Sequence, residues 1–258
     1  MTSYFHRAGG GRFRPTELTG GAWATDEQHI APMTGLIVHE ADRLAAGPAP
    51  DGMVITRISM DILGVLKLEE FDVDVAVVRP GRTIELLEAV VTARGRAAVR
   101  ARIWRMAQQD TSAVAGGAPQ PLPHPAGLAS YPLSQVWPGG FITSVDVRPV
   151  GAPEPGRARV WITSGVPLVA GEQASPLAEF VKLVDTANGI AARESPKEWL
   201  FPNLDLTVHL HRQPEGPWVG LDTTVAFGTT GAGLTSSVLH DVAGPVGRAE
   251  QILTVRPG

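Results

Sequence analysis

The sequence predicts an α+β fold made of two similar units in tandem, each an antiparallel sheet packed on one helix. Runs of alternating apolar and polar residues, separated by short turns, occur in both halves of the chain. Each half also holds one helical run, and the two runs start alike, with Ala31-Pro32-Met33 and Ser175-Pro176-Leu177. A stretch rich in proline and glycine, residues 116–125, lies between the halves.

The composition limits the classes of protein to consider. The 258 residues are 43% hydrophobic and 19% charged, which is typical of a globular protein. A net charge of -4 gives no sign of the basic surface that nucleic-acid binding requires. No apolar run approaches the roughly 18 residues that a membrane span requires. The absence of cysteine excludes disulfides, a cysteine nucleophile and thiolate metal ligands. With no signal peptide at its start, the chain is expected to be cytoplasmic.

The first unit, residues 1–108, is expected to contain one long helix and several strands. Apolar residues recur at helical spacing from Ile30 to about Ala45, and Gly47-Pro48 ends the run. Pro32 fits in the first turn of that helix, where its missing N–H costs little. Alternating runs predict strands at 3–7, 12–19, 53–63, 71–78, 83–93 and 97–106. Tight turns between the last of these indicate antiparallel pairing.

Residues 109–140 form the predicted linker, and the second unit, residues 141–258, repeats the pattern. Its helix is expected to have Ser175 as cap and Pro176 as first residue, and to end near Asn188-Gly189. Strands are predicted at 141–147, 157–163, 203–212, 218–227, 233–240 and 246–255.

The strand at 203–212 carries the densest set of chemical groups in the chain. Its sequence, Asn-Leu-Asp-Leu-Thr-Val-His-Leu-His-Arg, alternates strictly, so one face should be buried and the other polar. The expected buried face comprises Leu204, Leu206, Val208 and Leu210. The polar face comprises Asn203, Asp205, Thr207, His209 and His211. The His-x-His pair occurs in some metal sites, but solvated or hydrogen-bonded histidines are the expected interpretation, so neither a metal nor another cofactor is predicted.

From Asp205 to Arg212, the sequence Asp-Leu-Thr-Val-His-Leu-His-Arg is similar to the Asp-His-Ser-Met-Trp-Phe-His-Arg segment of type II acyl-CoA thioesterases, the TesB-like family. The similarity continues through Trp218 and reaches Gly244–Gln251, and Arg79-Pro80-Gly81-Arg82 resembles the first half of the same family. The resemblance implies a tandem, or double, hotdog fold, in which each sheet wraps around a helix. It also implies an acyl-CoA substrate and a homodimer.

In that family an aspartate, a hydroxyl residue and a glutamine hold the hydrolytic water. By resemblance, Asp205 matches the aspartate, which would activate water, and Gln251 matches the glutamine, which would orient it. The hydroxyl is the departure, because direct alignment from Trp218 places Ala226 there. Thr224 is two residues away and shares the face of Ala226, so it is the candidate replacement.

Other residues are candidates for the substrate site or the oxyanion. Asp185 lies in the second helix and is the rival carboxylate, which could instead shape the pocket. Arg212 and Arg248 could meet CoA phosphates. Backbone N–H groups at the helix start, residues 175–178, are candidate oxyanion donors.

Two alternatives stay open beside the thioesterase. One is a double hotdog that binds acyl-CoA or another lipid without turning it over, which Ala226 favours. The other is a hydratase or dehydratase, which would need an Asp/His pair.

Overall fold

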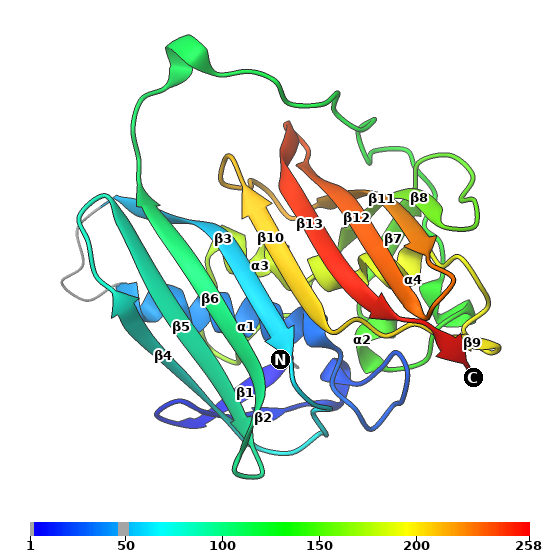
Figure 1. The fold of residues 1–258 in the computed structure, drawn as a ribbon, viewed down its shortest axis with the longest axis horizontal. Helices are drawn as coiled ribbons and strands as arrows, with labels where there is room; N and C mark the ends of the chain where they lie inside the picture. Colours follow the sequence, from blue (N-terminus) through cyan, green and yellow to red (C-terminus); the bar gives the residue numbers. More distant parts are fainter. Residues whose placement is uncertain (1–2, 46–51) are drawn as a thin grey trace.

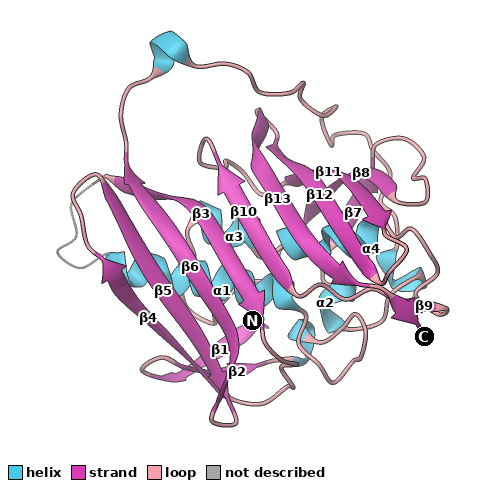
Figure 2. Ribbon diagram, in the orientation of Figure 1, coloured by secondary structure: helices cyan, strands magenta, loops and turns pink. Residues whose placement is uncertain are grey.

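The computed structural model describes residues 3–45 and 52–258, so the predicted helix stop at Gly47-Pro48 lies outside the described residues. Within these residues, the main feature is one antiparallel sheet of 12 strands (Figure 1 and Figure 2). The strand order is β1-β2-β4-β5-β6-β3-β10-β13-β12-β11-β8-β7. The first six strands in this order come from the first half of the chain and the other six from the second half.

The first half contributes one long helix, α1 (Ile30–Ala45), which matches the predicted span. Its strands are β1 (Phe5–Gly9), β2 (Arg12–Pro15), β3 (Met53–Ile62), β4 (Phe71–Arg79), β5 (Ile84–Ala93) and β6 (Arg96–Ala107). The four predicted strands after the helix are confirmed to within a few residues.

The second half contributes the strands β7 (Asp146–Pro149), β8 (Arg157–Thr163), β10 (Asp205–Leu210), β11 (Val219–Phe227), β12 (Ala232–Asp241) and β13 (Gly244–Thr254). Its helical segments are α2 (Gly140–Thr143), α3 (Pro176–Val181) and α4 (Ala187–Ile190). A 3₁₀ turn, Val184–Thr186, connects α3 to α4. Two further short strands, β9 (Trp199–Leu200) and β14 (Arg256–Pro257), pair with each other.

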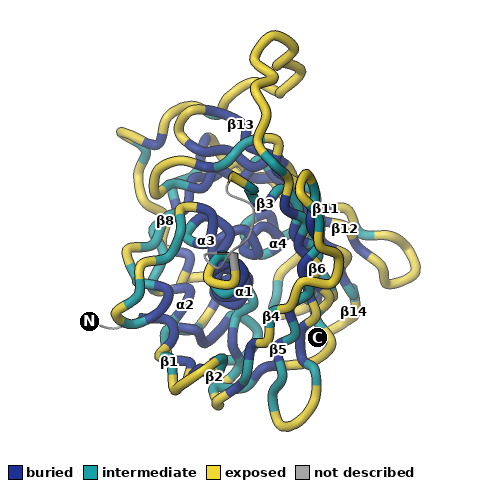
Figure 3. Tube along the Cα trace, turned by 90° about the vertical axis from the view of Figure 1, so that its left-hand side faces the viewer, coloured by how far each residue is buried: buried dark blue, intermediate teal, exposed yellow. Residues whose placement is uncertain are grey.

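The two half-sheets join where β3 pairs with β10 in antiparallel fashion, with Met60 opposite Leu206. Viewed from the side in Figure 3, the sheet curves around α1, α3 and α4, whose buried residues form the centre of the molecule. Each half is therefore a sheet wrapped around its own helical segment, and the predicted tandem hotdog is confirmed.

The helices of the two halves pack closely because Gly35 has no side chain. A Cβ atom at this position would lie 2.6 Å from the Cβ of Lys182 and 2.8 Å from the carbonyl oxygen of Ala178. Such distances are too short for real contacts, so a larger residue would push α1 away from α3. This contact fixes the first residues of α1 relative to the second helical segment.

Two local predictions are corrected. Residues 141–147 do not form one strand: α2 covers Gly140–Thr143, and β7 starts at Asp146. The second helix is not continuous, because the 3₁₀ turn interrupts it. Near the end of the predicted linker, Leu133 and Trp137 are buried, at 7% and 4% exposed. The apolar side chains of this segment pack beside α4, and Trp137 Nε1 donates to the carbonyl of Gly189 at 3.0 Å.

Candidate active site

A β-bulge at the start of β10 reverses the predicted direction of one side chain. Thr207 pairs with Glu250, but Asn203 pairs with Leu253. The chain thus advances four residues before β10 for three residues of β13, so the β10 side carries one extra residue. Leu253 is buried, and Asn203 therefore turns to the inner face. The predicted strict alternation is wrong at this end, and Leu204 is 49% exposed instead of buried.

Asp205 stabilises the bulge from the outer face of the sheet. Its Oδ1 accepts a hydrogen bond of 2.6 Å from the N–H of Ile252 on β13. On this face it lies opposite Asp61 of β3. Partial burial raises the pKa of Asp205, and the nearby carboxylates Asp61 and Glu250 raise it further, while the bond from Ile252 opposes them. The carboxylate thus holds a backbone N–H at the irregular point of the strand pair.

Asp185 lies on the inner side, in the 3₁₀ turn between α3 and α4, and is 3% exposed. Its Oδ1 accepts hydrogen bonds from Asn203 Nδ2 at 2.7 Å and from Gln251 Nε2 at 2.9 Å. Burial raises the pKa of Asp185 to about 7, although the two amide donors favour the charged form. Its Oδ2 makes no hydrogen bond within residues 3–45 and 52–258, which leaves one oxygen with free lone pairs.

His29 approaches Asp185 from the first half of the chain, with 3.7 Å between Nδ1 and Oδ2. Nδ1 accepts the backbone N–H of Ala31 at 3.1 Å, so the proton of the neutral ring is on Nε2. Burial lowers the pKa of His29 to about 3, which keeps the ring neutral. The ring packs on Phe141, with 4.4 Å between the centroids. The nitrogen nearest Asp185 is therefore the acceptor Nδ1, and the N–H of the ring is the one on Nε2.

A cavity of about 600 Å³ brings these groups together. Its lining includes Asp185, His29, Asn203 and Ile30, the first residue of α1. The first N–H groups of a helix have no intrahelical acceptor. Here Pro32 has no N–H and Ala31 donates to His29 Nδ1, so the N–H of Ile30 is the candidate donor that this helix start offers to the cavity. Much of the remaining wall is apolar and comes from both halves, namely Trp23, Ile62, Leu63, Val65, Leu66, Leu133, Trp137 and Ile142.

Among the predicted catalytic residues, Gln251 is brought to Asp185, whereas Asp205 and Thr224 are not. Thr224 is exposed on the outer face of β11, and Ala226 shares that face. The hydroxyl in register with Gln251 is that of Thr235 on β12, which is 1% exposed. Neither Thr235 Oγ1 nor Gln251 Oε1 finds a hydrogen-bond partner in the described part of the chain.

The two predicted phosphate contacts lie away from the cavity. Arg212 forms a paired contact with the buried carboxylate of Asp241, at 2.5 Å for each of two bonds, and so stabilises the turn between β12 and β13. Arg248 is exposed on the outer face of β13, opposite His209. The arginine that lines the cavity is Arg256, which is exposed near the end of the chain.

The predicted oxyanion donors at the start of α3 also lie elsewhere. The N–H of Ala178 donates to Ser175 Oγ at 3.1 Å, and that hydroxyl donates to Asp42 at 2.6 Å. None of residues 175–178 lines the cavity.

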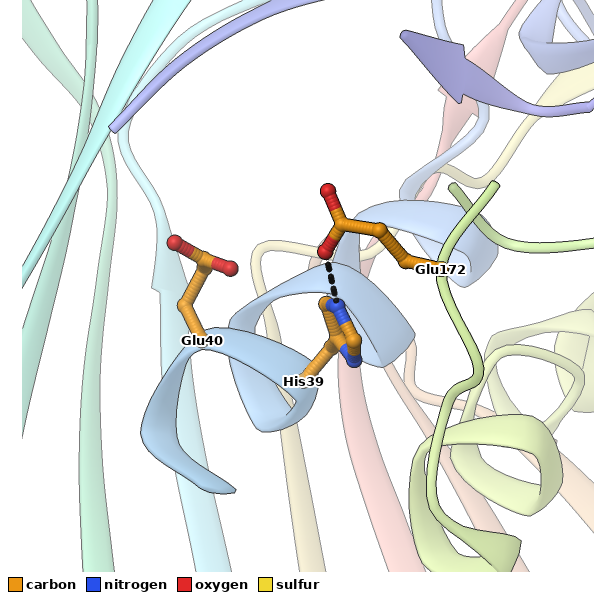
Figure 4. A group of neighbouring side chains, drawn as sticks. All are labelled: His39, Glu40 and Glu172. Carbon is orange, nitrogen blue, oxygen red and sulfur yellow. Dashed lines mark hydrogen bonds and ion pairs between the residues drawn. The ribbon is translucent and has the colours of Figure 1, made fainter. Parts of the chain in front are cut away.

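A separate group of possible metal ligands consists of His39, Glu40 and Glu172 (Figure 4). His39 Nε2 lies 2.9 Å from Glu172, and Arg7 binds both carboxylates, at 2.6 Å from Glu40 and 2.6 Å from Glu172. Arg43 adds a contact of 3.2 Å to Glu172. The Arg7 bonds lower the pKa of Glu172 to about 2. Two guanidinium groups thus supply the positive charge, and the cluster is an ion-pair network.

Two family models match most of the chain. Residues 19–106 match the acyl-CoA thioesterase N-terminal domain, and residues 116–255 match the acyl-CoA thioesterase C-terminal domain. The chain belongs to the acyl-CoA thioesterase family. It is therefore a thioester hydrolase, and the predicted TesB-like resemblance is confirmed.

Solved structures similar to this acyl-CoA thioesterase agree in fold. A hot dog protein of unknown function from Alicyclobacillus acidocaldarius has a TM-score of 0.75 and 12% identity, over 97% of this chain and 95% of that chain. The acyl-CoA thioesterase II TesB2 from Mycobacterium marinum has a TM-score of 0.68 and 16% identity, over 98% and 96%. The dehydratase domain of RzxB from Pseudomonas fluorescens has a TM-score of 0.56 and 12% identity, over 95% and 94%. No curated protein matches the chain.

Sequence reasoning missed three residues of this candidate site. Asn203 was expected on the wrong face, because a bulge leaves no mark in the alternation. His29 precedes a helix and carries no local motif, and its partner Asp185 is remote in the sequence. Arg256 follows the last long strand and resembles any terminal basic residue. Among the helices of residues 3–45 and 52–258, none combines the length and apolar composition needed to cross a membrane.

Proposed function

We propose that this thioesterase hydrolyses acyl-CoA to a free acid and CoA with Asp185 as general base. The single observation that carries the proposal is the asymmetry of the Asp185 carboxylate. Two amides hold Oδ1, while Oδ2 is free and the residue lines the cavity. A base acts best when its pKa is near the working pH, and burial raises the pKa of Asp185 to about 7.

In the proposed reaction, Oδ2 accepts a proton from a water molecule as that water attacks the thioester carbonyl carbon. The carbonyl oxygen becomes an oxyanion, which the Nε2–H of His29 and the N–H of Ile30 at the start of α1 stabilise. The intermediate then collapses, the carbon–sulfur bond breaks, and the thiolate of CoA leaves. The proton on Asp185 passes to that thiolate or to solvent, which restores the base.

Asn203 and Gln251 orient the carboxylate and favour its charged form. Removal of either donor leaves the carboxylate less ionised and freer to rotate. Asp205 acts indirectly, because its hydrogen bond with the N–H of Ile252 stabilises the bulge that turns Asn203 inward. We therefore assign Asp205 a positioning role.

The thioester is expected at the boundary between the two halves, with the CoA phosphates outside. Arg256 is the proposed phosphate contact, since it is exposed and lines the cavity. A dehydratase would also use an Asp/His pair, but it needs a base that removes a proton next to the carbonyl. The free nitrogen of His29 carries a proton, and Nδ1 is occupied by Ala31, so His29 is suited to donate.

The test is release of free thiol from a series of acyl-CoA esters, from short to long chains, with the purified full chain. Hydrolysis of at least one chain length, at a rate far above that of buffer, is the expected result. No thiol release across the series would contradict the proposal and favour an acyl-CoA-binding protein.

A further inference from the structure

A second cavity lies next to the first and shares part of its wall. Its volume is about 310 Å³, and Leu133 and Gly189 line both cavities. Leu133 comes from the end of the linker and is 7% exposed, and Gly189 comes from α4. Leu133 and Gly189 are thus part of the wall of both spaces.

The residues that follow Asp185 in the chain, from Gly189 to Ala192, lead from the first cavity to the second. Asp185 lies in the 3₁₀ turn and Gly189 in α4, four residues further along, which corresponds to a rise of about 6–8 Å. Ile190 and Ala192 continue into the wall of the second cavity. A chain that starts at the proposed reaction centre and follows this segment reaches the shared wall within about one helical turn.

The chemistry of the second cavity suits a hydrocarbon. Its wall includes Val147, Ala158, Val160 and Ile190. The only charged residue in the described lining is Glu154, which is exposed. An apolar chain gains from leaving water here, whereas a chain that ends in a carboxylate would meet the negative charge of Glu154.

We infer that the second cavity binds the far end of a long, uncharged acyl chain, which passes Leu133 on its way from the first cavity. This inference rests on the proposed function and adds the substrate class: long-chain acyl thioesters without a terminal charge. Leu133 and the residues of the second cavity then determine chain-length preference, while the groups around Asp185 perform the chemistry.

The experiment measures binding of S-alkyl-CoA thioethers, which cannot be hydrolysed, from butyl to octadecyl, by titration calorimetry. Each methylene that enters an apolar wall strengthens binding by about four-fold. In the wild type, affinity should rise along the series. Ala192→Phe fills the second cavity from its half-buried rim. In this variant, affinity should stop increasing at a shorter alkyl chain than in the wild type. Octadecyl-CoA should bind at least about ten-fold more weakly, and butyl-CoA should bind as in the wild type.

The matched control is Ala152→Phe, an exposed alanine outside both cavities. It should follow the wild-type profile. Ile190→Trp fills the same cavity from α4 and keeps the test available if Ala192→Phe does not fold. A loss that is equal at all chain lengths, or a profile unchanged by both fillings, would overturn the inference.

The thioether series also separates this inference from the proposed function. If the wild type releases no thiol but its thioether profile responds to the filled cavity, the proposed function fails and the tail site stands. If thiol is released and the filled cavity leaves the profile unchanged, the tail site fails alone.

Discussion

Asn203 Nδ2, just before β10, donates to Asp185 Oδ1 at 2.7 Å, in the 3₁₀ turn between α3 and α4. This contact exists because the bulge before β10 turns Asn203 to the inner face. With Gln251 on the same oxygen, the carboxylate is held in one orientation, and its other oxygen is left free for the proposed role as base.

The pH dependence of hydrolysis should report the ionisation of Asp185. Since the base form is required, kcat/KM should fall as the pH drops below about 7, the pKa of this group. Asn203→Ala removes a donor that favours the charged form, so the fall should begin at higher pH. The measurement is thiol release from pH 5 to 9, with Asn188→Ala as control, because this buried asparagine lines the cavity without bonding Asp185. The same profile in all three proteins would exclude Asp185 as the titrating group.

The stability of the fold should depend on the same ionisation. The pKa of Asp185 is about 7 in the folded chain and roughly 3.9 in an unfolded one, so folding favours its protonated form. This contribution is complete below about pH 4 and is lost as the pH rises through about 7. Asp185→Asn should therefore be more stable than the wild type at pH 8, by ~1–4 kcal/mol. Urea unfolding of both proteins at several pH values measures this difference in the free energy of unfolding. If the free energies of unfolding of the two proteins changed with pH in parallel, the Asp185 carboxylate would not be desolvated in the fold.

His29 should contribute to the rate through its Nε2–H. His29→Phe keeps a ring against Phe141 but removes the donor, and kcat should fall about a hundred- to thousand-fold with little change in KM. The neutral ring, with a pKa near 3, should add no second inflection above pH 4. His209→Gln, on the exposed face of β10, serves as control. A variant with unchanged kcat would remove His29 from the proposed oxyanion site.

Asp205→Ala should weaken both the fold and the rate. It removes the acceptor of the Ile252 N–H, so the free energy of unfolding should fall by ~1–3 kcal/mol. The disturbed bulge should lower kcat about ten-fold by misplacing Asn203. Asp61→Ala, the exposed cross-strand neighbour, should stay within about 0.5 kcal/mol of the wild type. Chemical denaturation and thiol release measure the two effects, and an Asp205→Ala protein as stable and active as Asp61→Ala would refute the positioning role.

Much of the fold was predictable because local patterns agree with the tertiary structure. The spacing of apolar residues predicted α1 over Ile30–Ala45, and alternation predicted the long strands of both halves. The linker was harder, because its buried residues Leu133 and Trp137 are isolated among exposed ones. A helix broken by a 3₁₀ turn and a β-bulge also follow from packing between distant elements, which periodicity does not register.

The site was less predictable than the fold for a physical reason. Gln251 and Asp185 were among the candidates, but their contact depends on a strand and a helix that are remote in the sequence. Asp205 had the expected residue type, yet one inserted residue in the strand decides which side chain faces inward. The expected homodimer, the cytoplasmic location and the division into units at residues 108 and 140 stay predictions.

The most direct test compares Asp185→Asn with Asp205→Asn in thiol release at pH 8. Asparagine at 205 still offers an oxygen to the N–H of Ile252, so a positioning role survives this change, whereas a general base does not. Asp185→Asn should lose at least about a hundred-fold in kcat while remaining folded, and Asp205→Asn should stay within several-fold of the wild type. The reverse result, with Asp205→Asn inactive and Asp185→Asn active, would contradict the account and make Asp205 the base.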